Sequence, residues 1–311
     1  MKLLNLSYSS LNVWHSCPTK FMMQKFAELE QAHRSSAATL IGTAVHESFQ
    51  TYLITESFEN AVKVLMLKYP IKLKKASTGK YHFLYAFYLL RQLINWYEQS
   101  GLQLMYINGK PAVEFKVETV YQIKKDGAAT GKEIHYIGFI DAIFLEKATG
   151  EVIICDIKTS STTASEEEEY SKYALSPQTV EYVSNFMSLL GYSDSEIKEH
   201  IDNVKVLYLI ARFNNIDSEV VPIWFTKTSE DLDNMRLAIT DLVAELLKKG
   251  KDLHNYYRSG NCNTFGQLCP FFPLCSSTDL IANFKLADFQ EPPTRGNPFN
   301  TQQIIKTINI N

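Results

Sequence analysis

The sequence lacks the features of membrane-spanning and secreted proteins. No apolar run approaches the ~18 residues that a membrane-spanning helix needs. The segment Met1–Ser7 lacks the long apolar stretch and the small-residue cleavage site of a signal peptide. Cysteine is sparse, with five residues in 311, and this odd number does not suggest the disulfide framework of a secreted domain. We therefore expect a cytoplasmic protein with no membrane partner.

An excess of either charge is also missing. Lys and Arg total 31 against 34 Asp and Glu, which gives a net charge of −3. This balance excludes a generally polybasic protein and, averaged over the whole chain, argues against a nucleic-acid partner. Hydrophobic residues make up 45% of the chain, which is ample for a packed core and excludes a disordered protein of low hydrophobicity.

Hydrophobic periodicity predicts helices followed by a mostly antiparallel sheet and further helices. The expected helices cover 7–26, 39–54, 81–98, 176–190 and 229–249, and the expected strands cover 112–123, 134–145, 151–157, 204–213 and 220–225. The acidic run Glu166–Glu169 is expected in a loop, and the polar residues 281–311 are expected to be irregular. This order predicts one α/β unit, because no linker divides the chain.

Two aspartates are expected to face each other across the hairpin that joins strands 134–145 and 151–157. If Lys147 pairs with Gly150 across the turn, the same register places Asp141 opposite Asp156, and Lys158 projects from the same face as Asp156. Two carboxylates ~5 Å apart repel by about 3 kcal/mol at an effective dielectric near 20. A divalent cation would offset this repulsion, and oxygen ligands favour Mg²⁺ or Mn²⁺ over Zn²⁺. The alternative is a solvated strand face, which fits poorly because an apolar run precedes Asp156.

Other polar residues fall where they could complete such a site. His46 lies on a predicted helix that is otherwise apolar on its inner face, and a single histidine there is more often a core residue than a ligand. Gln178 and Tyr182 are four residues apart on a predicted helix and therefore share one face. Glu114 could face the same side of the sheet as Asp141, but the sequence alone does not fix its orientation.

Taken in order, these segments resemble the PD-(D/E)xK nuclease superfamily. The matching segments are Gly42-x3-His46, Gly138-Phe139-Ile140-Asp141, Asp156-Ile157-Lys158-Thr159 and Gln178-x3-Tyr182. The opening, from Leu6-Ser7-Tyr8-Ser9-Ser10-Leu11 through Trp14 to Cys17-Pro18 and Phe21, is similar to one branch in particular. That branch contains the RecB and AddB nuclease domains and the CRISPR-associated Cas4 proteins. The resemblance spans about residues 6 to 275 and implies a restriction-endonuclease-like mixed β-sheet flanked by helices.

The resemblance also implies a metal centre. In this interpretation His46, Asp141 and Asp156 bind the catalytic metal together with the carbonyl of Ile157. Such a metal activates water and stabilises charge on the phosphate during in-line displacement.

The remaining motif residues are expected to act on water and substrate. The resemblance implies that Lys158 orients the attacking water or helps to deprotonate it. Gln178 and Tyr182 would contact DNA near the scissile phosphate.

Four of the five cysteines match a further feature of the same branch. There, one cysteine after the first helix and three near the C-terminus hold a [4Fe–4S] cluster, and the corresponding residues are Cys17, Cys262, Cys269 and Cys275. The first gap of the final trio holds six residues here, whereas the common spacing is two. Four thiolates also suit Zn²⁺, and free thiols are the third alternative. Cys155 adjoins Asp156 in a strand and is expected to be buried as a small hydrophobe.

Two groups of basic and aromatic residues are candidates for nucleic-acid contact. The first comprises Lys68, Lys72, Lys74, Lys75 and Lys80 with Tyr69 and Tyr81, and the second comprises Lys248, Lys249, Lys251 and Arg258 with Tyr256 and Tyr257. Basic residues interleaved with aromatics suit a backbone groove with stacking platforms for single strands. Solvated helix ends explain either group equally well.

These observations predict a Mg²⁺- or Mn²⁺-dependent deoxyribonuclease, in particular an exonuclease acting on single-stranded DNA or duplex ends. Recombination, repair, phage DNA metabolism and CRISPR adaptation are the expected settings, with other proteins of those processes as partners. We expect one nuclease domain over 1–311, with a helical region at 1–100, a catalytic core at 110–228, a C-terminal helix and cysteine-rich segment at 229–280 and a polar tail at 281–311. The alternatives are a DNA-binding or scaffolding subunit with the same fold, and an iron–sulfur redox protein.

Overall fold

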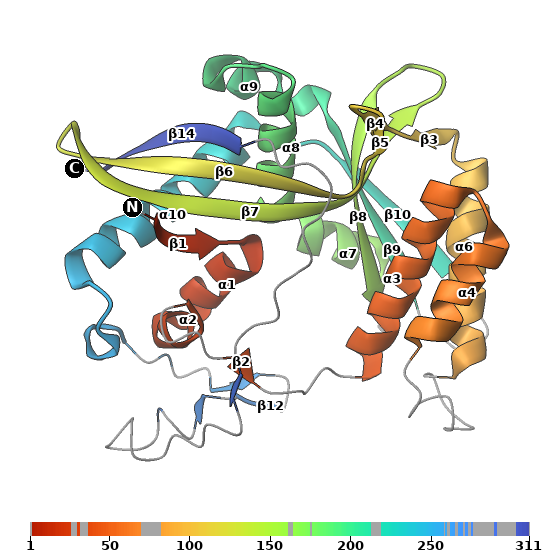
Figure 1. The fold of residues 1–311 in the computed structure, drawn as a ribbon, viewed down its shortest axis with the longest axis horizontal. Coiled ribbons are helices and arrows are strands. Elements are labelled where there is room, and N and C mark those ends of the chain that lie inside the picture. The colour runs from red at the N-terminus through yellow and green to blue at the C-terminus, as the bar shows by residue number, and fades with distance from the viewer. Residues whose placement is uncertain are drawn as a thin grey trace.

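A mixed β-sheet with helices on both faces forms the centre of the computed structural model (Figure 1). Its two longest strands curve across the molecule as a twisted hairpin. The structure describes residues 2–25, 30–31, 37–69, 82–160, 164–174, 176–212, 219–257, 259, 262–264, 267–269, 271–272, 275, 289–290 and 303–310.

The eight-stranded sheet combines antiparallel and parallel neighbours. Its strands are β1 (Lys2–Leu6), β3 (Leu102–Leu104), β6 (Val113–Lys125), β7 (Ala128–Glu146), β8 (Val152–Ser160), β9 (Lys205–Arg212), β10 (Glu219–Phe225) and β14 (Gln303–Ile310). Their order is β10-β9-β8-β7-β6-β14, while β1 and β3 both pair with β7. Strands β6, β7 and β8 form an antiparallel meander, whereas β8 and β9 run parallel and are joined by a helical crossover.

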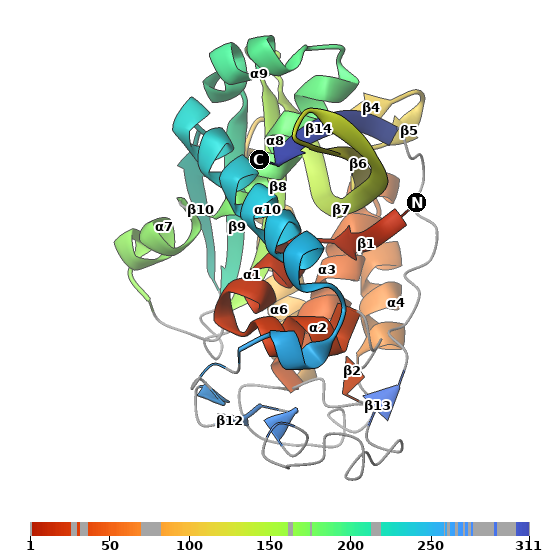
Figure 2. The ribbon, with the colours of Figure 1, turned by 90° about the vertical axis from the view of Figure 1, so that its left-hand side faces the viewer.

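Helices cover both faces of this sheet (Figures 1 and 2). One layer contains α8 (Pro177–Leu189), α9 (Asp194–His200) and α10 (Ser229–Lys249), and the opposite layer contains α3 (Ala37–Thr55), α4 (Phe58–Lys68) and α6 (Phe83–Gln99). Each layer closes its own apolar core against the sheet. A mixed sheet flanked by helices confirms the predicted restriction-endonuclease-like α/β class.

Shorter elements complete the described chain. They are α1 (Tyr8–Ser16), α2 (Pro18–Lys25), α7 (Glu166–Ala174), the 3₁₀ turns η1 (Ile201–Asn203) and η2 (Leu253–Asn255), and the strands β2 (Glu30–Gln31), β4 (Tyr106–Ile107), β5 (Lys110–Pro111), β11 (Asn263–Thr264), β12 (Gln267–Leu268) and β13 (Phe289–Gln290). The short strands pair as β2 with β13, β4 with β5 and β11 with β12.

The β7–β8 hairpin has the register that its turn predicts. Ala142 pairs with Cys155 and Leu145 with Val152, so one step further along the same register places Asp141 opposite Asp156. The turn closes on Gly150, whose φ of 75° lies in the left-handed region that glycine adopts without strain. The hairpin therefore carries both aspartates to the same level of the sheet.

The first predicted helix, 7–26, is divided in two. Ser7 caps α1 in a reciprocal capping box with Ser10. Cys17 then adopts an extended backbone (φ −161°, ψ 99°), because the ring of Pro18 disfavours helical geometry in the preceding residue. Pro18 starts α2, where its missing N–H is not needed. The break leaves Cys17 at the corner between the two helices.

The acidic run Glu166–Glu169 forms the first turn of α7, so its expected placement in a loop is wrong. The backbone N–H of Glu168 donates to the Oγ of Ser165 (3.2 Å), and the Ser165 N–H donates back to the Glu168 carboxylate (2.7 Å). Carboxylates in a first turn also meet the positive end of the helix dipole. The segment Glu166–Glu169, which was expected to be a loop, is therefore the start of a helix.

The expectation that residues 281–311 are irregular is wrong for the final strand. Strand β14 pairs in parallel with β6, from Gln303 beside Glu118 to Ile310 beside Lys125. Lys306, Ile308 and Ile310 point inward and are buried. The inward lysine interrupts the apolar alternation that would have marked a strand.

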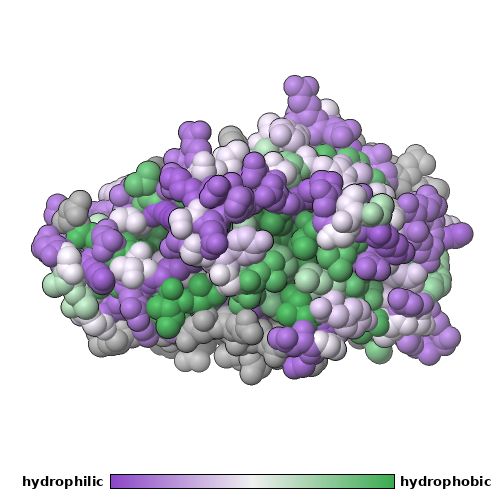
Figure 3. Space-filling model, turned by 90° about the horizontal axis from the view of Figure 1, so that it is seen from above, coloured by the Kyte–Doolittle hydropathy of each residue, from purple (hydrophilic) through white to green (hydrophobic). Residues whose placement is uncertain are grey.

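Hydrophilic side chains cover most of the molecular surface seen from above, and apolar side chains gather near the centre of that face (Figure 3). Among the described residues, no helix combines the length and the apolar character that a membrane crossing requires.

Candidate metal centre and active site

Asp141 lies at the point where the pairing of β7 with β8 ends, and two groups of the protein contact its carboxylate. The backbone N–H of Ile157 donates to Asp141 Oδ2 at 2.7 Å, and His46 Nε2 lies 3.2 Å from the same oxygen. The regular ladder ends at Ala142 and Cys155, which leaves the Ile157 N–H available for this bond. The predicted proximity of His46 and Asp141 is therefore present.

A glycine on α3 sets the position of His46. A Cβ added to Gly42 would overlap the Oγ1 of Thr159 on β8. Only a residue without a side chain lets α3 approach β8 this closely, and His46, one turn further along, then faces Asp141. The spacing of Gly42 and His46 thus has a packing cause.

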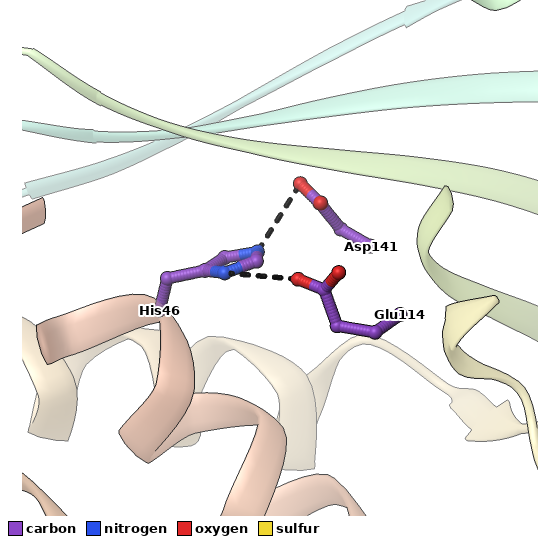
Figure 4. Close-up of side chains that lie close together, drawn as sticks. All are labelled: His46, Glu114 and Asp141. Carbon is purple, nitrogen blue, oxygen red and sulfur yellow. Dashed lines mark ion pairs between the residues drawn. The ribbon is translucent and has the colours of Figure 1, made fainter. Parts of the chain in front are cut away.

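Glu114 joins this pair and forms a three-residue group (Figure 4). Potential ligand atoms of His46, Glu114 and Asp141 all lie within 4.8 Å of one another, and this is the one such group among the described residues. Glu114 Oε1 lies 3.6 Å from His46 Nδ1 and accepts a hydrogen bond from Gln50 Nε2 at 2.8 Å. The backbone of Glu114 has a positive φ of 46°, a conformation that non-glycine residues adopt mainly at special sites.

Sequence reasoning left the orientation of Glu114 open and did not consider Gln50. Val113 pairs with Ala142 and Phe115 with Ile140, so Glu114 lies opposite Asp141. A bulge between Gln122 and Lys124 shifts the β6–β7 register by two residues, and nothing in the sequence announces that shift. A β6–β7 register extended from the turn without this bulge would therefore have placed Glu114 opposite the wrong residue of β7.

Asp156 is buried, at 1% exposure, and has its own partners. Lys158 Nζ forms an ion pair with Asp156 Oδ2, and Gln178 Nε2 donates to Asp156 Oδ1 at 3.2 Å. Burial raises the pKa of the Asp156 carboxyl to about 6, a rise that Lys158 opposes and Asp141 reinforces. Asp156 lies outside the three-residue group around Asp141, although Asp141 and Asp156 influence each other electrostatically.

An aromatic stack supports Lys158. Its Nζ lies 5.8 Å from the centre of the Tyr208 ring, which stacks on Tyr173 of α7 at 4.4 Å and on Phe225 of β10 at 5.6 Å. The faces of aromatic rings attract cations. The stack and Asp156 together fix a cation beside the carboxylates.

Gln178 and Tyr182 share the face of α8 that points toward Asp156. Gln178 Nε2 donates to the Tyr182 hydroxyl at 2.8 Å. The ring of Tyr182 lies against β7 so closely that a Cβ added to Gly138 would be 2.7 Å from its Cε1. Gly138 therefore allows α8 to bring both side chains next to the aspartates.

The electrostatic field holds His46 in its charged form. Burial by itself lowers the pKa of His46, but Asp141 beside it, helped by Glu114 and Asp156, raises that pKa to about 9. In return, His46 and Lys158 keep the pKa of Asp141 below its ordinary value despite burial.

Three of the four candidate cluster cysteines lie on a segment that packs against α2. Met23 and Phe271 form a small buried cluster to which Cys269 and Cys275 contribute, and Thr19 donates to the carbonyl of Tyr257 at 2.7 Å. Cys262 and Cys269 are joined by a backbone hydrogen bond of 2.6 Å.

Cys17 begins the turn into α2, next to the region that packs against the C-terminal segment. Within the described part of the chain, the cysteines do not form a group of three within 4.8 Å. Cys155 is buried in the sheet, as expected.

The structure contradicts part of the prediction for each of the two basic and aromatic groups. Tyr69 and Tyr256 are buried, at 1% and 5% exposure, so the expectation that they offer stacking platforms is wrong. Lys68 pairs with Glu47 and Lys249 with Glu245. Tyr257 is exposed. The remaining predicted contact residues lie outside the described residues, namely Lys72, Lys74, Lys75, Lys80, Tyr81 and Arg258.

Comparison with known proteins gives one family. A profile of the PD-(D/E)XK nuclease superfamily matches residues 5–276, a span that contains every motif described above. A search of curated proteins found no match. Among solved structures, "Crystal structure of SSO0001" is similar at 15% identity with a TM-score of 0.27, covering 68% of this chain and 79% of that chain. Because the family profile spans most of the sequence, the chain belongs to the PD-(D/E)XK nuclease superfamily.

Proposed function

We propose that this protein is a metal-dependent deoxyribonuclease that removes nucleotides from single-stranded DNA or duplex ends. The observation that carries the proposal is the convergence of α3, the β6–β8 meander and α8 on one polar site. His46 and the Ile157 N–H both contact Asp141 there, while Lys158 and Gln178 both contact Asp156. Membership of a nuclease superfamily supplies the reaction class.

The donor set suits Mg²⁺ or Mn²⁺. Two carboxylates and one imidazole offer ligand atoms within 4.8 Å of one another, and hard oxygen donors with an imidazole fit these ions. We assign His46, Asp141 and Glu114 as ligands, with Asp156 and the Ile157 carbonyl completing the site. A divalent ion bound there would lower the pKa of a coordinated water and neutralise charge that develops on the phosphate.

The chain's own residues orient the reactants. Lys158, held by Asp156 and the Tyr208 ring, presents a positive charge to the attacking water and to the scissile phosphate. Gln178 and Tyr182 lie next to Asp156 on α8, where they would contact the DNA strand on the side away from α3.

We further propose that Cys17, Cys262, Cys269 and Cys275 hold a [4Fe–4S] cluster, with Zn²⁺ as the alternative occupant. The contacts of Tyr257, Phe271 and the two cysteines Cys269 and Cys275 with α2 support this assignment, because they bring two distant parts of the chain together. The thiolates would join the ends of one domain over 1–311 around the nuclease core.

The proposed cellular setting rests on the resemblance of the motifs to the branch that contains the RecB and AddB nuclease domains and the Cas4 proteins. We propose a cytoplasmic enzyme of recombination, repair, phage DNA metabolism or CRISPR adaptation, acting with other proteins of those processes.

The test is cleavage of DNA labelled at one end. Wild-type protein is incubated with single-stranded, blunt and tailed duplex DNA in Mg²⁺, in Mn²⁺ and in EDTA. An exonuclease releases mononucleotides or short products from one terminus only in the presence of metal, and covalently blocked or circular DNA remains intact.

Cleavage of circular DNA would replace the exonuclease assignment with an endonuclease. DNA binding without cleavage in either metal would support a scaffolding subunit instead. Reversible reduction of a cluster, in a protein that neither binds nor cuts DNA, would support the redox alternative.

A further inference from the structure

Arg212 ends β9 on the face of the sheet that carries Asp156 and Lys158 of the proposed active site. Strands β8 and β9 are parallel neighbours in which Asp156 lies beside Tyr208 and Ser160 beside Arg212. Because side chains alternate between faces, Arg212 shares its face with Asp156 and Lys158. The pair Ser160–Arg212 lies two residues beyond Lys158, about 7 Å along the strand.

The guanidinium of Arg212 has donors that the described residues do not satisfy. Nη1 donates to Glu219 Oε1 at 2.7 Å, on the adjacent strand β10. Nε and Nη2 are buried and have no hydrogen-bond partner among the described residues, and the whole side chain is 10% exposed. A buried charged donor without an acceptor costs free energy. The arrangement therefore calls for an acceptor from outside the described residues.

The arrangement of the two donors without a partner, Nε and Nη2, indicates which class of acceptor would fit them. Nε–H and Nη2–H lie in the guanidinium plane and point in parallel from one edge of it, which matches two oxygens of a phosphate. Both nitrogens are buried, and a hydrogen bond from a charged donor to a phosphate oxygen is stronger in such surroundings than at an exposed arginine.

We propose that Arg212 binds, through Nε and Nη2, a backbone phosphate of the substrate strand next to the scissile phosphate. This inference rests on the proposed nuclease function and adds a substrate-binding residue to it. The separation from Lys158 along β8 is on the order of one nucleotide step. Arg212 would fix the register of the strand, while the metal centre and Lys158 act on the neighbouring phosphate.

A purely structural role is the alternative, because the ion pair with Glu219 links the two strands of the β9–β10 pair. The pair supplies its own matched control. Glu219→Gln breaks the ion pair but leaves the guanidinium in place, whereas Arg212→Gln removes both. If the arginine serves only the ion pair, the two variants behave alike.

The experiment measures binding of a single-stranded 20-mer in an Asp156→Asn background, which prevents cleavage. We expect Arg212→Gln to weaken binding about tenfold to a hundredfold and to reduce the slope of log K against log salt by about 1. Glu219→Gln should bind as well as its parent or more tightly, since a competing anion is gone. Equal weakening in both variants, or none in Arg212→Gln, would overturn the proposal.

Oligonucleotides with one neutral methylphosphonate linkage locate the contact. Neutralising the phosphate beside the scissile bond should weaken binding by the parent protein and have no further effect in Arg212→Gln. If the losses of binding from the neutral linkage and from Arg212→Gln were additive, the assignment of Arg212 to this phosphate would be contradicted. If Arg212→Gln does not fold, Arg212→Lys decides the question. It keeps the charge but loses the paired donors, so it should lose most of the methylphosphonate effect, and a full effect would reject the proposal.

Different results would contradict the proposed nuclease function and the proposed role of Arg212. A wild-type protein that neither binds nor cuts any nucleic acid contradicts the nuclease function itself. A wild-type protein that cuts DNA while Arg212→Gln binds normally contradicts only the role of Arg212.

Discussion

Two aspartates on neighbouring strands experience opposite environments. Asp141 accepts a backbone hydrogen bond and lies beside His46, so its pKa is lowered. Asp156 is buried deeper and, although Lys158 opposes the effect, its pKa rises to about 6. Pairs of acids whose environments separate their pKa values are common where chemistry needs two different roles. Here the separation supports a charged ligand at Asp141 and a second carboxylate that gains from a bound cation.

The pKa of His46 predicts how metal affinity depends on pH. Its value of about 9 in the metal-free protein, against 6.5 for a free histidine, means that the proton stabilises the fold below pH 6.5. That contribution is lost as pH rises through about 9. A metal ion requires neutral imidazole, so binding releases this proton and Mn²⁺ affinity should increase from neutral pH to about 9.

Titration calorimetry in two buffers of different ionisation enthalpy measures the released proton. His46→Gln should bind Mn²⁺ more weakly and lose the release. Equal affinity at neutral pH and at pH 9 in the wild type would contradict the assignment of His46 as a ligand.

Gly42 offers a second test at the scale of single residues. Gly42→Ala should destabilise the protein by about 1–3 kcal/mol because its Cβ overlaps Thr159, and it should weaken Mn²⁺ binding because His46 moves with α3. Urea denaturation and metal titration measure the two effects. Thr43→Ala, at an exposed neighbouring position, serves as the control.

The double variant Gly42→Ala with Thr159→Ala removes the overlapping Oγ1 and should recover part of both losses. If the second substitution adds to the damage, close packing of α3 on β8 is not the reason for this glycine.

At the scale of elements, a buried polar network holds α8 on the sheet. Asn185 accepts a hydrogen bond from the Thr119 hydroxyl of β6 and donates to Glu181 at 3.1 Å. Lys306 of β14 donates to Ser184 at 2.8 Å. All five side chains are buried. The network therefore ties the C-terminal strand to the helix that carries Gln178 and Tyr182.

Asn185→Ala tests this network. The substitution removes the acceptor of the Thr119 hydroxyl and one of the donors to Glu181, which keeps its contact with Tyr121, and should lower the free energy of unfolding by about 2 kcal/mol. Ser188→Ala is the matched control on the same helix, because its hydroxyl bonds only to the Ser184 carbonyl of its own helix. Urea denaturation compares the two. Equal stability of both variants would show that the network does not hold α8.

The elements that sequence reasoning predicted best are those whose boundaries have local causes. The turn at 147–150 fixes the β7–β8 register, and hence the level of Asp141 and Asp156, through a glycine at positive φ. Helix α10 runs from Ser229 to Lys249 as expected because Thr228 caps its start and Gly250 follows its end.

The errors arose where distant residues decide the outcome. Lys306 occupies an inward position where its partners, Ser184 and Asp194, lie on other elements, so the sequence pattern did not indicate a strand at β14. Glu114 depends on the bulge near Gln122, and Gln50 matters only because α3 approaches the sheet from the opposite side. Such contacts have no signature in the local pattern.

At the scale of the whole molecule, the proposed cluster joins the corner after α1 to the C-terminal segment. Cys17→Ser should lower both the iron content of the purified protein and its melting temperature, because one link between the two ends is lost. Metal analysis, absorbance near 400 nm and thermal denaturation measure these changes. Cys155→Ala, which alters the one cysteine in the sheet core, should keep its iron. A colourless wild type with stoichiometric zinc would contradict the cluster.

Global charge proved a poor guide to function at this scale. The net charge of −3 includes the carboxylates of the proposed metal site and the acidic start of α7. Acidic residues that hold a cation can serve nucleic-acid chemistry, so their number does not oppose it.

The most direct test of the account is the rate at which end-labelled DNA is cut in Mn²⁺ by the wild type, Asp156→Asn and Lys158→Met. Lys147→Met, at an exposed lysine in the β7–β8 turn, is the control. We predict metal-dependent cleavage by the wild type and the control, and a loss of about a hundredfold or more in the two site variants, with their melting temperatures close to that of the wild type. Undiminished cleavage by Asp156→Asn, or cleavage by the wild type in EDTA, would contradict the account.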